Sequence, residues 1–190
     1  MSARTSMSHP IRLDLIDGRV VGVPGRIGMT FAPGKIGPSV QGYQWDRHLE
    51  TDLARLRETY GATTLVCLVE PHELTFMQIE NLPARATHHG LHCIEFPIVD
   101  VSIPRAIGPF HALILEVCRR LTAGETVAVH CRGGLGRTGI VAASCLIQLG
   151  LAAPDAVRLV REMRPGTIET REQEDFVVQV FAPLVHDDGR

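Results

Sequence analysis

The sequence predicts an α/β fold in which a mostly parallel central sheet has helices on both faces. Two segments, 63–70 and 125–130, are apolar and β-branched without alternation, which is typical of strands buried on both faces. Segments with the helical spacing of apolar residues follow strands through the middle of the chain. No internal repeat, low-complexity stretch or linker divides the 190 residues, so we expect a single domain over 1–190.

The first half of the chain is predicted to alternate short strands and helices. Residues 1–10 are polar, and we expect them to be disordered. Gly and Pro divide the segment 13–35 into two short strands joined by turns. Apolar residues recur at helical spacing from 45 to 60, and a glycine ends that helix. The buried strand at 63–70 comes next, followed by a short helix after Pro71.

The second half repeats the alternation and then becomes helical. A strand is predicted within 91–100, a helix over about 105–122 and the second buried strand at 125–130. Three helical patterns then cover about 137–149, 154–163 and 170–182.

Composition excludes several classes of function. The chain is 45% hydrophobic and 21% charged with a net charge of −2, and it has no Lys/Arg block, so we expect neither a nucleic-acid partner nor membrane binding. No apolar run approaches the ~20 residues of a transmembrane helix. The polar first ten residues lack an apolar signal core, so we predict a cytoplasmic protein. The sequence does not predict an oligomeric state.

The cysteines and histidines do not indicate a disulfide framework or a metal site. Five cysteines are an odd number in apolar contexts, which fits a reducing compartment. The stretch HHGLHC at 88–93 has the composition of a metal site, but His92 and Cys93 are successive strand residues with side chains on opposite faces. We therefore predict no metal.

A glycine-rich loop joins the predicted strand at 125–130 to the helix that follows, and ligands bind at such places in open α/β sheets. Its glycines permit backbone torsions that turn successive amides toward one anion, reinforced by the helix dipole. Arg137 adds a planar fork of donors for two phosphate oxygens. The predicted phosphate-binding residues are Arg132, Gly133, Gly134, Leu135, Gly136 and Arg137.

Cys131 stands at the head of this loop and is the predicted nucleophile. In the field of the loop its thiol becomes more acidic than a free thiol, and the thiolate can attack phosphorus to form a phosphocysteine. Arg137 and the amides would bind the charge of the transition state. Thr138 is predicted to donate its hydroxyl to the sulfur, and His130 to brace the loop backbone. A plain turn or a nucleotide loop is the alternative, but Walker loops need a lysine where Arg137 stands.

The stretch HCRGGLGRT resembles the H-C-x5-R-[S/T] signature of the cysteine-dependent protein-tyrosine phosphatase superfamily. The resemblance covers about 27–182: GMTFAPGK, TLVCLVE, FPIVDVSIP and RPGTIETREQEDFV are similar to the compact dual-specificity branch, in particular to cyclin-dependent kinase inhibitor 3-type phosphatases. It implies a five-stranded central sheet with helices on both sides, and no metal or organic cofactor. The chain would then be a single phosphatase domain.

Asp100 is the predicted general acid. Phosphate monoester cleavage leaves an oxyanion that needs a proton, and a loop carboxyl can supply it and later accept one from water. Asp100 follows a strand, precedes the breaker-rich VSIPRAIGP, and matches the position of the family's acid in FPIVD. The alternative is a cap for the helix expected to begin near 104.

The resemblance implies further roles, each with a plainer alternative. Gln173 matches a glutamine that places the hydrolytic water in relatives, or it lies on a helix surface. Cys67 matches a cysteine that in some relatives forms a reversible disulfide with the nucleophile, or it is a buried structural thiol. Arg132 could bias substrate choice at the pocket rim. Glu169 and Glu172 are interpreted as acids of a first helical turn.

The predicted function is hydrolysis of phosphoprotein monoesters, on phosphotyrosine and with phosphoserine and phosphothreonine as further substrates. Two alternatives stay open. One is a non-protein substrate: a phosphoinositide, an inositol phosphate or an RNA 5′-phosphate. Relatives that hydrolyse phosphoinositides carry lysines within the loop, and this loop has none. The other is a phosphopeptide-binding module without turnover.

Overall fold

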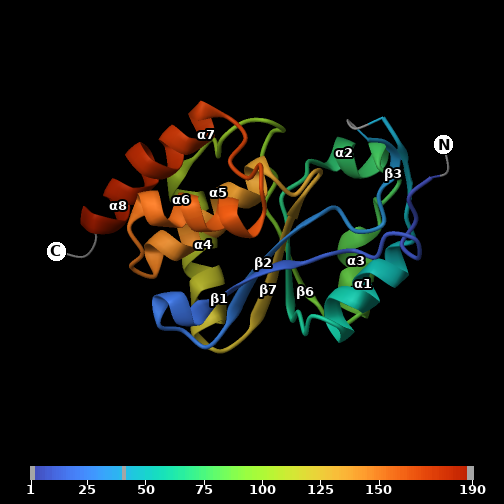
Figure 1. The fold of residues 1–190 in the computed structure, drawn as a ribbon, viewed down its shortest axis with the longest axis horizontal. Coiled ribbons are helices and arrows are strands. Elements are labelled where there is room, and N and C mark those ends of the chain that lie inside the picture. Colours follow the sequence, from blue (N-terminus) through green and yellow to red (C-terminus); the bar gives the residue numbers. More distant parts are fainter. Residues whose placement is uncertain (1–2, 40–41, 188–190) are drawn as a thin grey trace.

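Five strands form one mixed sheet in the computed structural model, which describes residues 3–39 and 42–187 (Figure 1). Their order is β1 (Asp14–Asp17), β2 (Arg26–Phe31), β7 (Thr126–Cys131), β5 (Thr64–Cys67) and β6 (His92–Glu95). β1 is antiparallel to β2, and all other neighbouring pairs are parallel. The prediction of a mostly parallel five-stranded sheet is confirmed.

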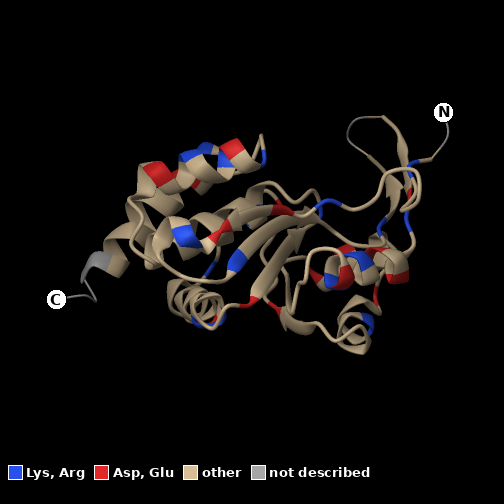
Figure 2. Ribbon diagram, turned by 60° about the horizontal axis from the view of Figure 1, so that its bottom comes forward, with Lys and Arg blue, Asp and Glu red and all other residues tan. Residues whose placement is uncertain are grey.

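The middle strand β7 and its neighbour β5 are the most deeply buried strands. Every residue of β5 and β7 is buried, and neither strand contains an Asp, Glu, Lys or Arg. Figure 2 shows the charged residues mainly on the helices and loops around the sheet. Continuous apolar strands are stable only with both faces covered, so their sequence requires the helical layers on either side.

Helices cover both faces of the sheet, as predicted (Figure 1). On one side lie α1 (Leu49–Glu58), α2 (Pro71–Phe76) and α3 (Leu82–His88). On the other side lie α4 (Ile107–Thr122), α5 (Gly136–Gln148), α6 (Ala153–Met163), α7 (Arg171–Asp175), the π-helical turn η2 (Phe176–Phe181) and α8 (Ala182–Asp187). Twelve consecutive residues of α5, 136–147, are buried, which fixes the helix against the sheet directly after the glycine-rich loop. Within the described ranges no helix is long and apolar enough to cross a membrane.

A short hairpin that the sequence does not predict lies beside the sheet. It consists of β3 (Ile36–Pro38) and β4 (Gln44–Asp46). Trp45, assigned from its spacing to a helix over 45–60, belongs to β4 and packs against Phe31 with ring centroids 5.1 Å apart. The helix therefore begins at Leu49, because the indole is used in an aromatic cluster and not on the helix face.

The expected disorder of residues 1–10 is wrong for residues 3–10. Arg4 pairs with Trp45 as an isolated bridge, and its guanidinium lies 3.7 Å from the centre of the Tyr43 ring. Ser6 is buried and accepts a hydrogen bond from the amide of His48 at 2.9 Å. Contacts with the hairpin order this polar segment, which lacks an apolar pattern of its own. Residues 1–2 lie outside the described residues.

Candidate active site

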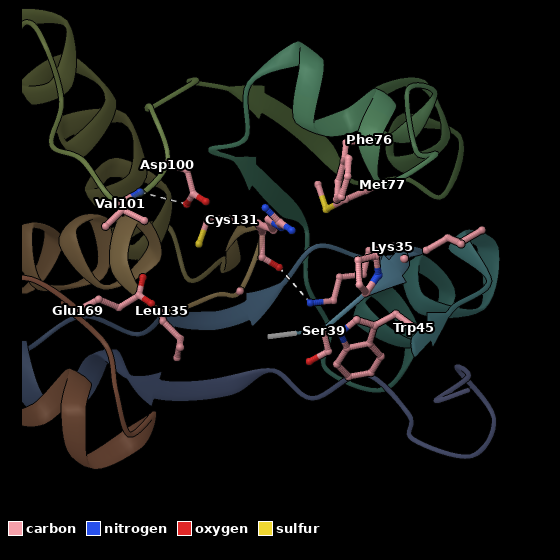
Figure 3. Close-up of a pocket in the computed structure, with 15 residues that line it drawn as sticks. Lys35, Ser39, Trp45, Phe76, Met77, Asp100, Val101, Cys131, Leu135 and Glu169 are labelled. Carbon is pink, nitrogen blue, oxygen red and sulfur yellow. Dashed lines mark hydrogen bonds between the residues drawn. The ribbon is translucent and has the colours of Figure 1, made fainter. Parts of the chain in front are cut away.

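The glycine-rich loop lies at the carboxyl end of β7, the middle strand, where α5 begins. Beside it is a cavity of about 210 Å³ whose lining includes Cys131 and Arg132. Figure 3 shows Asp100 and Glu169 on one side of Cys131 and Lys35 and Trp45 on the other. The cavity therefore has an acidic side and a basic, aromatic side, with the sulfur between them.

Cys131 is buried, and its sulfur accepts a hydrogen bond from the amide of Gly134 at 3.2 Å. Gly134 has a φ of +73°, and a Cβ there would lie 2.3 Å from the carbonyl oxygen of Thr30. The loop can bring this amide to the sulfur only because Gly134 has no side chain. Arg164 holds the loop from outside, donating to the carbonyls of Gly134 at 2.6 Å and Gly133 at 3.1 Å.

Gly134→Ala is expected to lower Tm by roughly 5 °C or more and kcat/KM at least about tenfold, because the methyl group meets the Thr30 carbonyl and the backbone is strained. Gly133→Ala is the matched control, because a Cβ at Gly133 has no neighbour within 4 Å. Thermal denaturation of both variants checks this prediction. An unchanged Tm for Gly134→Ala would mean that the loop has another geometry.

Arg137 is fully buried and held by a fork of two hydrogen bonds to Glu73. Its Nη1 donates to Oε2 at 2.6 Å and its Nη2 to Oε1 at 2.9 Å. Nη1 also donates to the carbonyl of Ile98 at 2.9 Å, and Nη2 to Oδ1 of Asp100 at 2.6 Å. Nε has no hydrogen-bond partner in the described part of the chain. On the edge formed by Nε and Nη2, Nε thus has no partner in the described part of the chain, and Nη2 is paired with the carboxylate of Asp100.

Glu73 is a site residue that the sequence does not reveal. It is the third residue of α2 and forms a capping box with Glu70, whose amide donates to it at 2.9 Å. Burial raises the pKa of Glu73, but the hydrogen bonds from Arg137 and from the amide of Glu70, together with the positive charge of Arg137, lower it, and the net change is downward. Burial lowers the pKa of Arg137, whereas the hydrogen bonds to Glu73 and the negative charges of Cys131, Glu73 and Asp100 raise it, and the net change is upward. The pair is therefore ionised and fixes the guanidinium below the loop.

Asp100 lies beside Arg137, and its role as the general acid stays a prediction. Its side chain is 44% exposed, and besides Arg137 it accepts from the amide of Val101 at 3.1 Å. The alternative of a helix cap is wrong, because α4 begins at Ile107 with Ala106 in the capping position. Val101 has a φ of +56°, which a β-branched residue rarely adopts, so the loop after Asp100 is strained at the site.

Gln173 and Glu169 connect this loop to the glycine-rich loop. Gln173 is fully buried, not on a helix surface; its amide oxygen accepts from the amide of Glu169 at 2.9 Å and its nitrogen donates to the carbonyl of Ser102 at 3.2 Å. Oε2 of Glu169 accepts from the amide of Gly136 at 2.8 Å. That amide, predicted to bind phosphate, is thus already paired. Glu169 precedes α7 and is not in its first turn, whereas Glu172 is.

His130 and Thr138 flank the loop from within the core. The Nδ1 of His130 lies 3.4 Å from the carbonyl oxygen of Cys131, and burial lowers the pKa of His130 to about 4. The imidazole is therefore neutral at pH 7, in keeping with a bracing role. The hydroxyl of Thr138 is buried and makes no hydrogen bond to any residue that the structure describes, the sulfur included. Its predicted donation to Cys131 stays a prediction.

Cys67 lies on β5, next to the strand of Cys131. The register pairs Cys67 with His130, so its side chain is on the His130 face, whereas Cys131 points to the other face. Burial raises the pKa of Cys67 to about 12, which leaves little thiolate for disulfide exchange. The geometry favours a buried structural thiol, and the disulfide stays a prediction of the resemblance. Among the described residues no group of three or more His, Cys, Asp or Glu is placed to hold a metal ion.

Known proteins resemble this chain in sequence and in fold. A sequence model of the DSP-PTPase phosphatase domain of the Swiss Army Knife type (PTP-SAK) matches residues 42–177. The chain belongs to this family. The DSP-PTPase match begins before β4 and spans β5, β6, β7, Asp100 and the whole glycine-rich loop, and it confirms the resemblance to compact dual-specificity phosphatases.

The similar curated proteins and solved structures are also named as phosphatases. Protein tyrosine phosphatase type IVA 2 of Mus musculus is 32% identical over 114 residues, which are 60% of this chain and 64% of that protein, so the chain matches less than two thirds of its relative. A kinase-associated phosphatase with its catalytic-site cysteine changed to serine has the same fold, with a TM-score of 0.78 and 23% identity over 88% of this chain and 92% of that one. Tk-PTP in its active form gives 0.65 at 26% identity, over 84% and 92%.

Proposed function

We propose that the protein is a metal-independent cysteine phosphatase that hydrolyses phosphoprotein monoesters, first of all phosphotyrosine, through a phosphocysteine on Cys131. The observation that carries the proposal is the edge of Arg137 formed by Nε and Nη2. Nε is buried without a partner, and the outer hydrogen of Nη2 is held by the carboxylate of Asp100. A carboxylate at this edge marks the place where an oxyanion can bind.

Binding of a phosphate would exchange one anion for another. Two phosphate oxygens take the Nε and Nη2 hydrogens, while Glu73 keeps the inner fork. Asp100 is released from Nη2 and stays beside the bound phosphoryl group, where it is available to the leaving oxygen. The same displacement thus binds the substrate and frees the acid.

The reaction then follows in two balanced steps. The thiolate of Cys131 forms a bond to phosphorus as the bond to the leaving oxygen breaks, and that oxygen takes a proton from Asp100. Water next forms a bond to phosphorus and gives its proton to Asp100, and the sulfur–phosphorus bond breaks. Arg137 and the loop amides bind the equatorial oxygens in both steps. Gln173 holds the loop that carries Asp100 in place, because its side-chain nitrogen donates to the carbonyl of Ser102.

Asp100→Asn is expected to lower kcat about 10²- to 10³-fold and to remove the fall of activity on the basic side of the pH profile, because the amide cannot give a proton. Steady-state kinetics with a phosphotyrosine peptide from pH 5 to 9 tests this. Asp155→Asn is the control, since Asp155 is an exposed carboxylate on α6. A profile for Asp100→Asn that keeps its basic limb would assign the acid to another group.

Three observations support a phosphoprotein substrate. The curated relatives are named protein tyrosine phosphatases. Phe76 and Val101, which line the cavity, are 53% and 56% exposed and offer apolar contacts to a peptide side chain. No lysine lies within the loop itself. We further propose a cytoplasmic location, because all five cysteines are free thiols, as is usual in a reducing compartment.

Phosphate release from a substrate panel tests this choice. We expect faster release from phosphotyrosine peptides than from phosphoserine or phosphothreonine peptides, phosphoinositides, inositol phosphates or RNA 5′-phosphates. Faster release from any non-protein substrate would overturn the proposed substrate class. Tight peptide binding without release would make the protein a binding module.

A further inference from the structure

Lys35 is the single lysine of the chain, and it lies at the proposed active site. Its side chain approaches the glycine-rich loop from the segment between β2 and β3, and the residue is only 9% exposed. Nζ donates to the carbonyl of Arg132 at 3.1 Å and lies 4.5 and 4.7 Å from the ring centres of Phe31 and Trp45. The two rings and the carbonyl fix the ammonium at the cavity wall.

The ammonium has unused hydrogen-bonding capacity. It carries three N–H donors, and its bond to Arg132 is the one hydrogen bond that Lys35 makes within the described residues. A buried charge is costly unless it is paired, and the two remaining N–H groups have no hydrogen-bond acceptor among the described residues. An anion in the cavity would satisfy both requirements.

Apart from the thiolate of Cys131, the charged groups that act on Lys35 are positive. Arg47 stacks on the same rings but is neutralised by Asp52 at 2.8 Å, and Arg164 is paired with Asp14 at 2.6 Å. Arg132 makes no ion pair with any residue that the structure describes; its guanidinium lies 5.0 Å from the centre of the Phe76 ring. Lys35 and Arg132 are therefore two unpaired cations on the wall of one cavity.

This basic wall is separate from the proposed chemistry. In Figure 3, Lys35 and Trp45 lie across Cys131 from Asp100 and Glu169. The cavity shares Lys35 and Trp45 with a second groove of about 480 Å³, which is also lined by Tyr43. A peptide held by its phosphoryl group at Cys131 can extend past Lys35 into this groove.

We propose that Lys35 and Arg132 form a second anion subsite that binds an acidic side chain next to the phosphorylated residue of a peptide substrate. This inference rests on the proposed function and specifies its substrate: a phosphopeptide with a flanking Asp, Glu or second phosphorylated residue. The subsite differs from the phosphate-binding edge of Arg137, because its donors are the ammonium of Lys35 and the guanidinium of Arg132.

The protonation of Lys35 gives the subsite a pH signature. Burial lowers the pKa of Lys35 to about 7; the charge of Cys131 raises it, and the charges of Arg47, Arg132 and Arg164 lower it. The ammonium is therefore charged below about pH 7 and loses its charge above it. Preference for an acidic neighbour should be strong at pH 6 and weak at pH 8.5. In Lys35→Arg it should not change with pH over this range, because a guanidinium stays charged.

The test compares two phosphotyrosine peptides that differ by Glu or Gln beside the phosphotyrosine. For the wild type we expect kcat/KM about tenfold higher with Glu at pH 6, as for one charge-assisted hydrogen bond. In Lys35→Met the Glu-to-Gln ratio should fall to about 1. The ratio is internal to each variant, so a general loss of activity does not affect it. Arg158→Met, an exposed arginine on α6, should keep the wild-type ratio.

The outcomes separate the subsite from the proposed function. Equal turnover of both peptides by the wild type would overturn the subsite and leave the phosphatase intact. Absence of phosphate release from every peptide would instead overturn the proposed function. If Lys35→Met does not fold, as judged by its thermal denaturation, Arg132→Met is the second variant, and an unchanged ratio there would overturn the subsite. If Lys35→Met changed the turnover of inositol polyphosphates but not the Glu-to-Gln ratio of the peptides, the proposed subsite would also be overturned.

Discussion

Cys131→Ser is expected to lower kcat for a phosphotyrosine peptide by at least about 10⁴-fold, as for loss of an enzyme's nucleophile. The serine hydroxyl is far less acidic than a thiol, so it is not ionised at neutral pH and cannot form the bond to phosphorus. Serine is close to cysteine in shape and can accept the hydrogen bond that the Gly134 amide now gives to the sulfur. We therefore expect the Tm to stay within about 2 °C.

Cys93→Ser is the matched control for this substitution. Cys93 is on β6, outside the cavity lining, so kcat should stay near the wild-type value. Retained turnover in Cys131→Ser, with Cys93→Ser equal to the wild type, would remove Cys131 from the chemistry.

Arg137→Lys is expected to lower kcat/KM by at least about 10³-fold. An ammonium has no planar fork, so it cannot hold both oxygens of Glu73 and two phosphate oxygens together. The variant should also lose several degrees of Tm, because the buried Glu73 carboxylate loses one of its two bonds to residue 137. Kinetics and thermal denaturation measure the two effects separately.

Glu73→Gln separates positioning from phosphate binding at Arg137. The amide keeps the shape of the side chain but removes the negative charge beside the guanidinium. We expect kcat/KM to fall about tenfold, far less than for Arg137→Lys, because the Nε and Nη2 edge is still present but less well oriented. An equal fall of kcat/KM in the two variants would mean that the ion pair with Glu73, and not the edge formed by Nε and Nη2, carries the function of Arg137.

The parts of the fold that follow from local pattern could be predicted from the sequence. β5 and β7 are continuous apolar runs, and α4 has helical periodicity, so their type and position follow from their own residues. The hairpin β3–β4 could not be predicted, because its strands have three residues each. Its aromatic cluster forms only once β2 places Phe31 beside Trp45.

The site divides in the same way. The predicted nucleophile, Cys131, and Arg137 are close in the sequence and have a recognisable spacing. Glu73, Glu169 and Lys35 come from other segments and meet this loop only in the folded chain. Glu73 also belongs to a capping box, and this structural role is enough to explain an acid at that position, so the sequence does not mark it as a site residue. A buried arginine needs a counterion, and that need is the signal that could have directed a search for Glu73.

The central claim is that a phosphoryl group passes through the sulfur of Cys131. Rapid quenching of a single turnover with a phosphotyrosine peptide, followed by mass spectrometry of the digested protein, tests it most directly. The mechanism predicts one phosphoryl group on the peptide that contains Cys131, formed before free phosphate appears and absent in Cys131→Ser. Release of phosphate in the first turnover without any phosphorylation of Cys131 would contradict it.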